Sequence, residues 1–213
     1  MGSILDPTYE PPRALPFPAG TSPFRQKGNG YIGDLAHFDV CVTGGARAVI
    51  AALPDPGCRI FFGQKFKSSE WYDAFPGAML HATAAQLRGI PYAEHRRQVG
   101  VYHASAAGGV YRALLHVLSN EAIAVWGPRV SSIYFEFGKF ETRASGPGEV
   151  TGVRRGMPAG LVQSTMFGSK GFTEETLRLA GAKAARFEIG AVEPGGRLYG
   201  QALFDAAIRV TWT

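Results

Sequence analysis

The sequence has only two cysteines, Cys41 and Cys58, among 213 residues, and they do not form a CxxC pair. Small secreted domains that depend on disulfides carry more cysteines, and structural zinc sites need clustered ligands. The first residues also lack the basic segment and apolar run of an export signal. These absences exclude a disulfide framework and a zinc-cysteine site, and we expect a cytoplasmic location.

Long apolar runs and concentrated charge are missing as well. No stretch reaches the roughly 18 apolar residues of a membrane helix, so we expect no membrane span. The 22 basic and 17 acidic residues give a net charge of +5, but the basic residues are scattered, with the tightest pairs at Arg96-Arg97 and Arg154-Arg155. Nucleic-acid binding normally needs a basic stripe, so we expect no nucleic-acid partner.

Catalytic motifs are absent too. The sequence has no HExxH zinc motif and no GxSxG nucleophile elbow, and TGGARA at 43–48 lacks the lysine of a phosphate-binding loop. We therefore expect no enzymatic activity, no metal site and no cofactor.

The composition is that of a globular protein, with 46% hydrophobic and 18% charged residues. Six of the 14 prolines lie within residues 1–29, which predicts a proline-rich arm over 1–30, either flexible or packed along a partner or its own domain. Residues 31–213 are then expected to form a single ligand-binding-like domain.

Local patterns predict mixed secondary structure. Residues 38–44 alternate like a short strand and 44–54 like a helix. Residues 68–89 are helical over most of their length, with a break or a fresh start at Pro76, and the helical pattern continues from Pro91 to Gly138. A hairpin is expected at 139–156, a helix interrupted at Gly168 and Gly171, and a last hairpin turning at 194–196. We therefore predict an α+β fold with helices packed on a mostly C-terminal antiparallel sheet.

The histidines in VYHASAAGGVYRALLHVL, His103 and His116, raise the question of a ligand site. Small residues follow His103, so a planar group such as heme could approach it. A histidine in a helix is more commonly a packing residue, and the two lie too far apart along a helix to share one site.

Large aromatic residues next to this Gly/Ala-rich helix predict an apolar pocket, because rings form walls and small side chains leave room. A few polar groups would orient the guest. The candidate ligand-binding residues are Trp71, Tyr72, Phe75, Tyr102, His103, Tyr111, Arg112 and Trp126.

Four segments carry a family resemblance: SSEWYDAFPGAML, AEHRRQVGVYHASAAGGVYRALLHVLSNEAIAVWGPRVSSIYFEFGKFE, LAGAKAARFEI and the closing RVTW. They resemble a family of uncharacterised proteins abundant in myxobacteria. That family is similar to the 4-vinyl reductase small-molecule-binding domain. It shares the wider fold of heme-nitric-oxide-binding domains and of transport-particle subunits of Golgi tethering complexes. The resemblance spans roughly residues 35–212.

The resemblance implies an α+β domain, often a homodimer through its helices, that binds a small hydrophobic molecule without catalysis. Two departures matter. The last hairpin, EPGGRLYGQALFD, has none of the cysteines of the 4-vinyl reductase type. The Tyr-x-Ser-x-Arg motif of the heme-binding relatives is missing, because YHAS lacks the arginine.

We therefore expect a non-enzymatic binding or sensor domain for a small hydrophobic ligand held between helices and sheet. The alternative is a structural or protein-interaction module, either a homodimer or a scaffold for a protein partner. A heme-based sensor acting through His103 is a further alternative.

Overall fold

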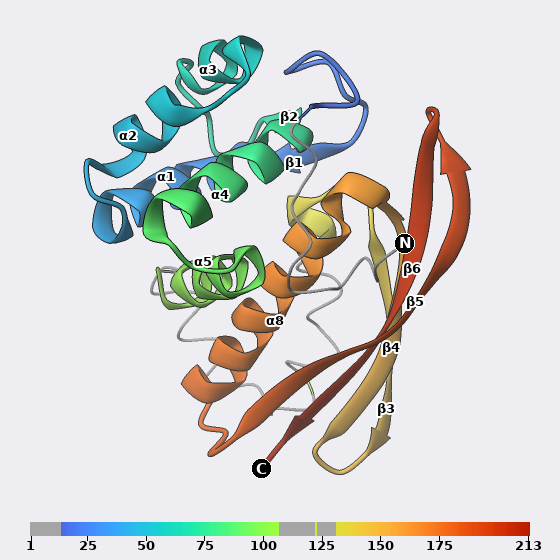
Figure 1. Ribbon diagram of the computed structural model, residues 1–213. Helices are drawn as coiled ribbons and strands as arrows, with labels where there is room; N and C mark the ends of the chain where they lie inside the picture. The colour runs from blue at the N-terminus through green and yellow to red at the C-terminus, as the bar shows by residue number, and fades with distance from the viewer. Residues whose placement is uncertain (1–13, 107–121, 123–130) are drawn as a thin grey trace.

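The computed structural model describes residues 14–106, 122 and 131–213. We call residues 14–106 the helical lobe and residues 131–213 the sheet lobe; they lie side by side (Figure 1). The helical lobe contains, in order, β1 (Arg25–Lys27), α1 (Gly28–Cys41), α2 (Gly45–Ala52), α3 (Pro56–Phe62), β2 (Trp71–Asp73), α4 (Phe75–Arg88) and α5 (Tyr92–Ala106). The short strands β1 and β2 pair antiparallel.

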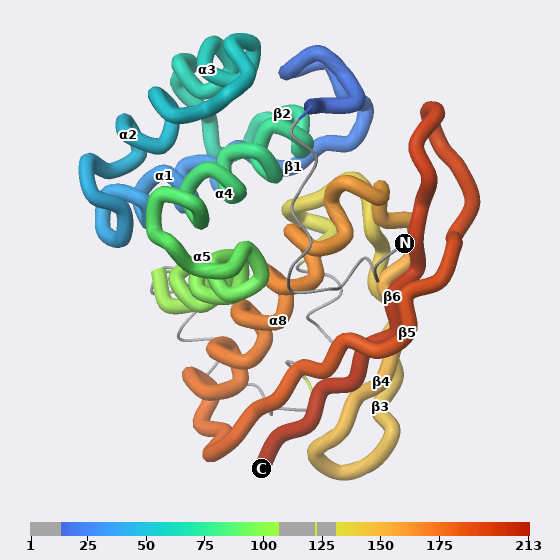
Figure 2. The backbone as a smooth tube through the Cα atoms, in the orientation of Figure 1, coloured from blue at the N-terminus to red at the C-terminus, as the bar shows by residue number. Residues whose placement is uncertain are grey.

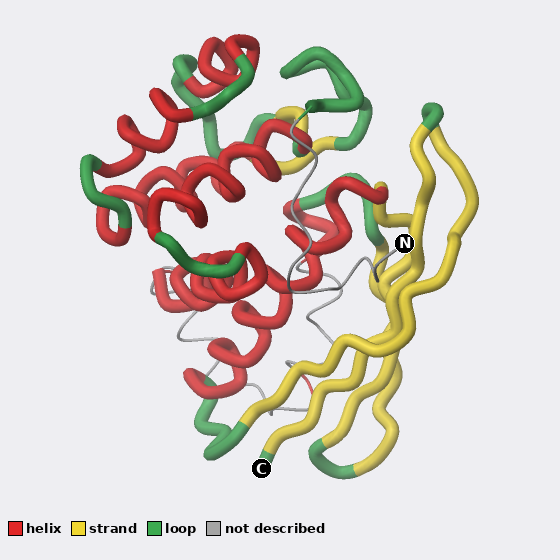
Figure 3. The backbone as a smooth tube through the Cα atoms, viewed as in Figure 1, coloured by secondary structure: helices red, strands yellow, loops and turns green. Residues whose placement is uncertain are grey.

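The sheet lobe is built on four antiparallel strands in the order β3-β4-β6-β5. Its elements are β3 (Lys139–Gly146), β4 (Glu149–Pro158), the 3-10 turn η1 (Ala159–Leu161), α8 (Val162–Leu179), β5 (Ala185–Leu198) and β6 (Gln201–Trp212). Helix α8 lies along one face of this sheet, and α5 lies against α8 (Figure 3). The predicted α+β fold with a C-terminal antiparallel sheet is confirmed.

The strand predicted at 38–44 is wrong, because these residues form the last turns of α1 and the loop after it. Tyr31, Asp34 and Phe38 are buried at spacings of three and four, which is the pattern of a helix with one face in the core. The local alternation of FDVCV is too short to outweigh that burial.

Pro76 marks a fresh helix start, one of the two expected outcomes at that position. It occupies the first turn of α4, where a missing amide donor costs nothing. The buried Asp73 holds this start in place, because its carboxylate accepts from the Phe75 amide at 2.9 Å and from the Gly20 amide at 3.0 Å. The same carboxylate therefore ties residues before β1 to the beginning of α4.

The predicted interruptions at Gly168 and Gly171 are wrong, since α8 is continuous from Val162 to Leu179. These glycines allow close approach instead. A Cβ atom on Gly171 would lie 1.9 Å from the carbonyl oxygen of Arg97, and one on Gly100 would lie 2.1 Å from that of Gly168. The backbones of α5 and α8 are therefore in direct contact, and no group can lie between them there.

The last hairpin turns later than expected. β5 and β6 pair through 194–196, with register shifts between Ile189 and Val192 and between Pro194 and Gly196, and the chain reverses after Leu198, which pairs with Gln201. Tyr199 carries the turn with φ 49, and its ring meets Phe24 of the helical lobe at 5.8 Å. The β5–β6 ribbon runs past the rest of the sheet toward the helical lobe (Figure 2).

Each lobe has its own hydrophobic core. In the sheet lobe, Met166 and Leu177 of α8 pack on Val150, Ile208 and Trp212 of the sheet. In the helical lobe, Tyr31 contacts the rings of Phe61, Phe62 and Phe66. A third cluster joins the lobes around Phe24, Phe75, Phe137 and Leu161.

One cation is buried in the sheet lobe. Arg154 of β4 is fully buried near the rings of Phe135 and Phe140, and it donates to the Gly138 carbonyl at 2.9 Å and to Ser169 Oγ at 2.9 Å. Burial lowers its pKa to about 9. These bonds fasten β4 to α8 and to the chain before β3.

Within the described residues, no single helix has the length and apolar character needed to cross a membrane. α1 and α2 satisfy that test together, by length and composition, but they are bent by 106°.

Candidate functional site

A buried polar cluster occupies the centre of the helical lobe. We call it the Asp34 cluster; it comprises Asp34 and His37 on α1, His81 and Arg88 on α4, and His95, Arg96 and His103 on α5. It gathers four of the five histidines of the chain around one carboxylate, and the fifth, His116, lies outside the described residues. Asp34 and His81 are both at most 5% exposed.

The members of the cluster form a chain of hydrogen bonds. Arg88 Nη1 lies 3.0 Å from His95 Nδ1, His95 Nε2 lies 3.2 Å from His81 Nδ1, and His81 Nε2 lies 3.2 Å from Asp34 Oδ2. The other carboxylate oxygen, Oδ1, lies 2.9 Å from His103 Nε2. The contacts join three helices through side chains alone.

The chemistry of the two ends fixes the direction of the chain. A guanidinium can only donate and an ionised carboxylate can only accept. His95 Nδ1 therefore accepts from Arg88, His95 Nε2–H donates to His81 Nδ1, and His81 Nε2–H donates to Asp34. Both rings are neutral in this arrangement, and each ring donates through Nε2 and accepts through Nδ1. Arg96 Nη1 also contacts His81 Nε2. Both atoms carry hydrogen in this assignment, so the contact is not a hydrogen bond; Arg96 would donate there only if the His81 proton were on Nδ1, which would break the bond to Asp34.

The protonation states agree with this assignment. Burial and the nearby Arg96 lower the pKa of His81 to about 4. Burial, His81 and the two arginines lower the pKa of His95 to about 2. Burial opposes ionisation of Asp34, but hydrogen bonds and charge from His81 and His103 hold the pKa of its carboxyl well below the ordinary value. At physiological pH the Asp34 carboxylate is therefore ionised beside neutral His81 and His95.

His37 is the exception in the cluster. It is buried, and neither ring nitrogen has a hydrogen-bond partner in the structure. Its ring packs on that of Tyr102 with 4.7 Å between the centroids. Burial, followed by the charge of Arg88, lowers its pKa to about 4. The ring is therefore neutral at physiological pH.

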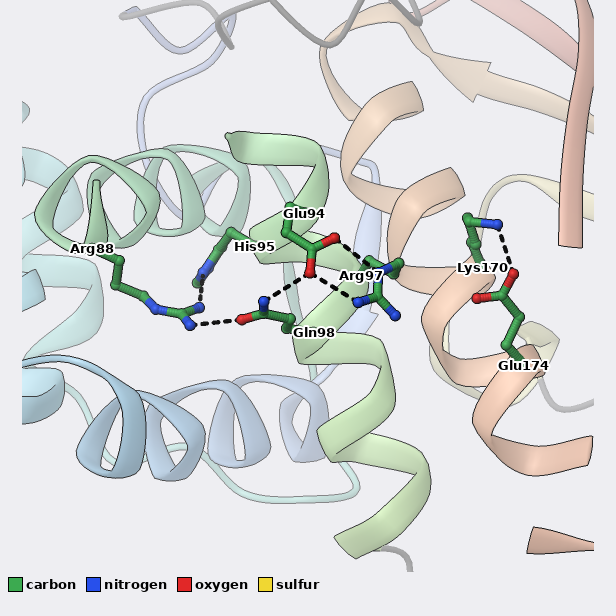
Figure 4. A network of polar contacts seen from close by, with 7 residues as sticks. All are labelled: Arg88, Glu94, His95, Arg97, Gln98, Lys170 and Glu174. Atoms are coloured by element: carbon green, nitrogen blue, oxygen red, sulfur yellow. Dashed lines mark hydrogen bonds and ion pairs between the residues drawn. The ribbon is translucent and has the colours of Figure 1, made fainter. Parts of the chain in front are cut away.

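A second set of polar contacts holds Arg88, the arginine of the cluster that lies on α4 (Figure 4). Arg88 Nη2 donates to Gln98 Oε1 at 2.6 Å, and Gln98 Nε2 donates to Glu94 Oε1 at 2.8 Å. Glu94 also accepts two hydrogen bonds from Arg97. Glu94 is thus bonded along α5 to Arg97 and Gln98, outside the chain of hydrogen bonds from Arg88 to Asp34.

A small cavity adjoins the cluster at the seam between the lobes. Its volume is about 10 Å³, close to the minimum for one water molecule. Its lining is mixed, with the apolar Phe137 and Leu161 and the polar His81, Arg96 and Ser164. Arg96 crosses the seam, where its Nε donates to the Ser164 carbonyl oxygen at 3.1 Å.

The five described candidates from the sequence do not line one cavity. Trp71 lies under the Lys27 ammonium at 4.0 Å, and Tyr72 packs on Phe66. Phe75 is buried in the cluster between the lobes, where its ring meets that of Phe24. Tyr102 and His103 belong to the α1–α5 contact. Tyr111, Arg112 and Trp126 lie outside the described residues.

The sequence interpretation did not identify Asp34, His81, His95 or Arg96 as functional candidates. Their spacing matches no motif, because the cluster forms only when α1, α4 and α5 pack together. In the structure four of the histidines lie on α1, α4 and α5, but no feature of the sequence indicates that these helices bring them together. Within the described part of the chain, no group of three or more His, Cys, Asp or Glu side chains could hold a metal ion.

Comparison with known proteins supports the fold. No family model matches the chain, and no curated protein matches it. Solved structures do match: an unliganded Fe(II) H-NOX protein from K. algicida is 12% identical with a TM-score of 0.61, covering 88% of this chain and 96% of that one. A mutant of the same protein is 14% identical, with a TM-score of 0.60 over the same shares.

A third match comes from a study of heme redox potential and porphyrin distortion. It is 11% identical with a TM-score of 0.57, covering 87% of this chain and 99% of that one. The chain therefore has an H-NOX-like fold over most of its length. At these identities the likeness establishes the fold alone.

The described residues do not fit a heme at His103. Its Nε2 is bonded to the Asp34 carboxylate, and its ring lies against α1, where a Cβ atom on Gly33 would be 2.4 Å from His103 Cε1. The direct contact of α5 with α8 at Gly100 and Gly171 leaves no space for a porphyrin between those helices. His103 is thus placed as a partner of Asp34.

Proposed function

We propose that the protein is a non-enzymatic, sensor-type domain that binds a small hydrophobic molecule between its helices and its sheet. The observation that carries the proposal is the likeness of nearly nine-tenths of the chain to H-NOX proteins, 88% in the K. algicida case. The solved structures of those proteins are described by the ligand state of an iron and by a heme. Because solved structures with this fold are described with an iron or a heme, we expect a ligand in this protein as well.

The seam between the lobes is the site we propose. Phe137 and Leu161 supply apolar wall, while Arg96 and Ser164 supply the few polar groups that orient a ligand. Because the cavity is only about 10 Å³, a guest larger than water requires the lobes to move apart. Phe75 packs beside this seam. Ligand contacts by the other candidate residues stay predictions, and so do a homodimer and a protein partner.

The driving force would be apolar burial. Each Å² of apolar surface removed from water contributes about 25 cal/mol before the costs of association. Separating Phe137 and Leu161 from their neighbours costs contacts of the same kind. Only a ligand that replaces those contacts would bind, which favours a flat or compact apolar molecule with one polar group.

A thermal-shift screen with native mass spectrometry tests the proposal. We expect at least one class of small apolar compound to raise Tm, and we expect Ala74→Val to abolish that shift because Ala74 lines the cavity and valine fills it. Ala36→Val, on the exposed side of α1, is the matched control and keeps the response. Hemin is included in the screen, and we expect no Soret band that depends on His103.

Two results would contradict the proposal. One is a screen in which no apolar compound shifts Tm or is retained in the mass spectrum. The other is a shift that Ala74→Val leaves unchanged, since the ligand would then bind elsewhere. The alternative of an interaction module predicts a stable dimer by light scattering with no ligand response.

A further inference from the structure

The Asp34 cluster has the organisation of a proton-responsive contact. Its hydrogen-bond chain uses both nitrogens of His81 and both nitrogens of His95, each as a donor on one side and an acceptor on the other. Adding a proton to either ring converts its acceptor into a second donor. His95 Nδ1–H would then face the Arg88 guanidinium, or His81 Nδ1–H would face His95 Nε2–H.

The surrounding charges make that proton costly. Arg88 of α4 and Arg96 of α5 are already next to the rings, and Asp34 of α1 is the one carboxylate in contact with them among the described residues. Glu94 of α5 is engaged by Arg97 and Gln98. From α8 the cluster meets a backbone carbonyl, that of Ser164, through Arg96.

The remaining imidazoles do not relieve the added charge. His37, on α1, is a buried ring with no hydrogen-bond partner among the residues that the structure describes. His103 of α5 already uses the second oxygen of Asp34, and its side chain is 25% exposed. A positive charge added to those of Arg88 and Arg96 therefore meets only the Asp34 carboxylate, whose two oxygens are already used by His81 and His103. Separation of α5 from α4 is the direct way to hydrate it.

The cluster also connects mechanically to the seam. His81 and Arg96 both line the small cavity between the lobes, and Arg96 holds α8 through the Ser164 carbonyl. Because α5 and α8 are in direct backbone contact, separation of α5 from α4 moves His81 away from Arg96 across this cavity. Opening the cluster thus opens the seam.

We propose that the Asp34 cluster is an acid-operated latch: proton uptake by the His81–His95 pair releases α5 from α4 and α1 and opens the seam between the lobes. The inference concerns the packing of this chain and does not depend on the identity of any ligand.

The pH range follows from the direction of the shifts. Histidine has an ordinary pKa of 6.5, and the closed cluster lowers the values of His81 and His95 to about 4 and about 2. The closed state therefore binds fewer protons than the open one, and its advantage is fully present above pH 6.5. That advantage declines as the pH falls from 6.5 toward 4.

Hydrogen exchange of the full chain at about pH 7.5 and about pH 5, corrected for the intrinsic rates, tests the latch. We expect α4 and α5 to lose protection by about tenfold or more at the lower pH, while β4 and β6 keep theirs. Equal loss in both lobes, which is ordinary acid unfolding, would overturn the inference, and so would unchanged protection of α4 and α5.

Two variants assign the response. His81→Gln/His95→Gln keeps a donor and an acceptor at each position but cannot titrate, so we expect α4 and α5 to stay protected at the lower pH. His103→Gln is the matched control and keeps the response, since glutamine still donates to Asp34. If the double variant does not fold, imidazole 15N shifts of the wild-type protein decide: neutral His81 and His95 at pH values where α5 is exchanging freely would refute the latch.

Discussion

The two faces of α5 are packed by opposite means. Toward α8, glycines remove side chains, and backbone meets backbone at Gly100 and Gly171. Toward α1 and α4, the contact is made by long polar side chains, including His95 and His103. The backbone atoms of the first contact do not titrate and have no room to yield, whereas the second contact depends on the protonation of buried groups.

This difference indicates which contact of α5 is permanent and which depends on pH. A contact made by glycine backbones is insensitive to pH and intolerant of added volume. A contact made by a buried carboxylate and imidazoles tolerates some shape change but depends on every partner being present. Substitutions at the two contacts of α5 should therefore lower the free energy of unfolding with different dependence on pH.

The largest effect is expected from Gly171→Ala. The new Cβ atom would lie 1.9 Å from the Arg97 carbonyl oxygen, so α5 and α8 must move apart. We expect a loss of about 3 kcal/mol or more in the free energy of unfolding, with little dependence on pH. Urea unfolding of the variant measures it.

Gly146→Ala is the matched control for that change, because a Cβ atom there has no neighbour within 4 Å. It should change the free energy of unfolding by less than about 0.5 kcal/mol. A Gly171→Ala variant as stable as this control would show that α5 and α8 are not in close contact.

Asp34→Asn should have the next largest effect. The neutral amide leaves either His81 or His103 without its acceptor and removes the anion that offsets Arg96. We expect a loss of about 2–4 kcal/mol in the free energy of unfolding at neutral pH. Urea unfolding across a pH series should also show a weaker pH dependence than in the wild-type protein.

Asp39→Asn, on the same helix, is the control for that variant. Asp39 is exposed and accepts one hydrogen bond, from the Ala46 amide at 2.8 Å, which asparagine can replace. Its expected cost is below about 1 kcal/mol. Equal costs for Asp34→Asn and Asp39→Asn would remove the Asp34 cluster as an organising feature of the lobe.

The sequence was sufficient for elements whose signals are local. The hairpin at 139–156, the helix from Pro91 and the start at Pro76 follow from turn residues and from proline chemistry. Gly168 and Gly171 misled the prediction because a glycine that weakens a helix and a glycine that admits a neighbouring helix are identical in sequence. Which one applies depends on α5, more than 60 residues away.

The candidate site was harder still to predict. Aromatic residues indicated a pocket, and Phe75 does lie beside the seam. The Asp34 cluster needs residues from three helices whose arrangement no spacing rule supplies. His103 was singled out as a possible heme ligand, and the structure gives it a different partner, because Asp34 of α1 is buried opposite it.

The smallest effect is expected on the outer face of the sheet. Arg155 bridges Glu141 and Asp205, with its Nε 2.8 Å from Glu141 Oε2 and its Nη1 2.9 Å from Asp205 Oδ2. The Arg155 and Glu141 side chains are exposed enough for water and salt to screen them. We expect Glu141→Gln to change the free energy of unfolding by less than about 0.5 kcal/mol. Urea unfolding at low and high salt measures this change. A loss comparable to that of Asp34→Asn would mean that exposed and buried charged contacts contribute equally to stability. The contrast between the two contacts of α5 would then lose its physical basis.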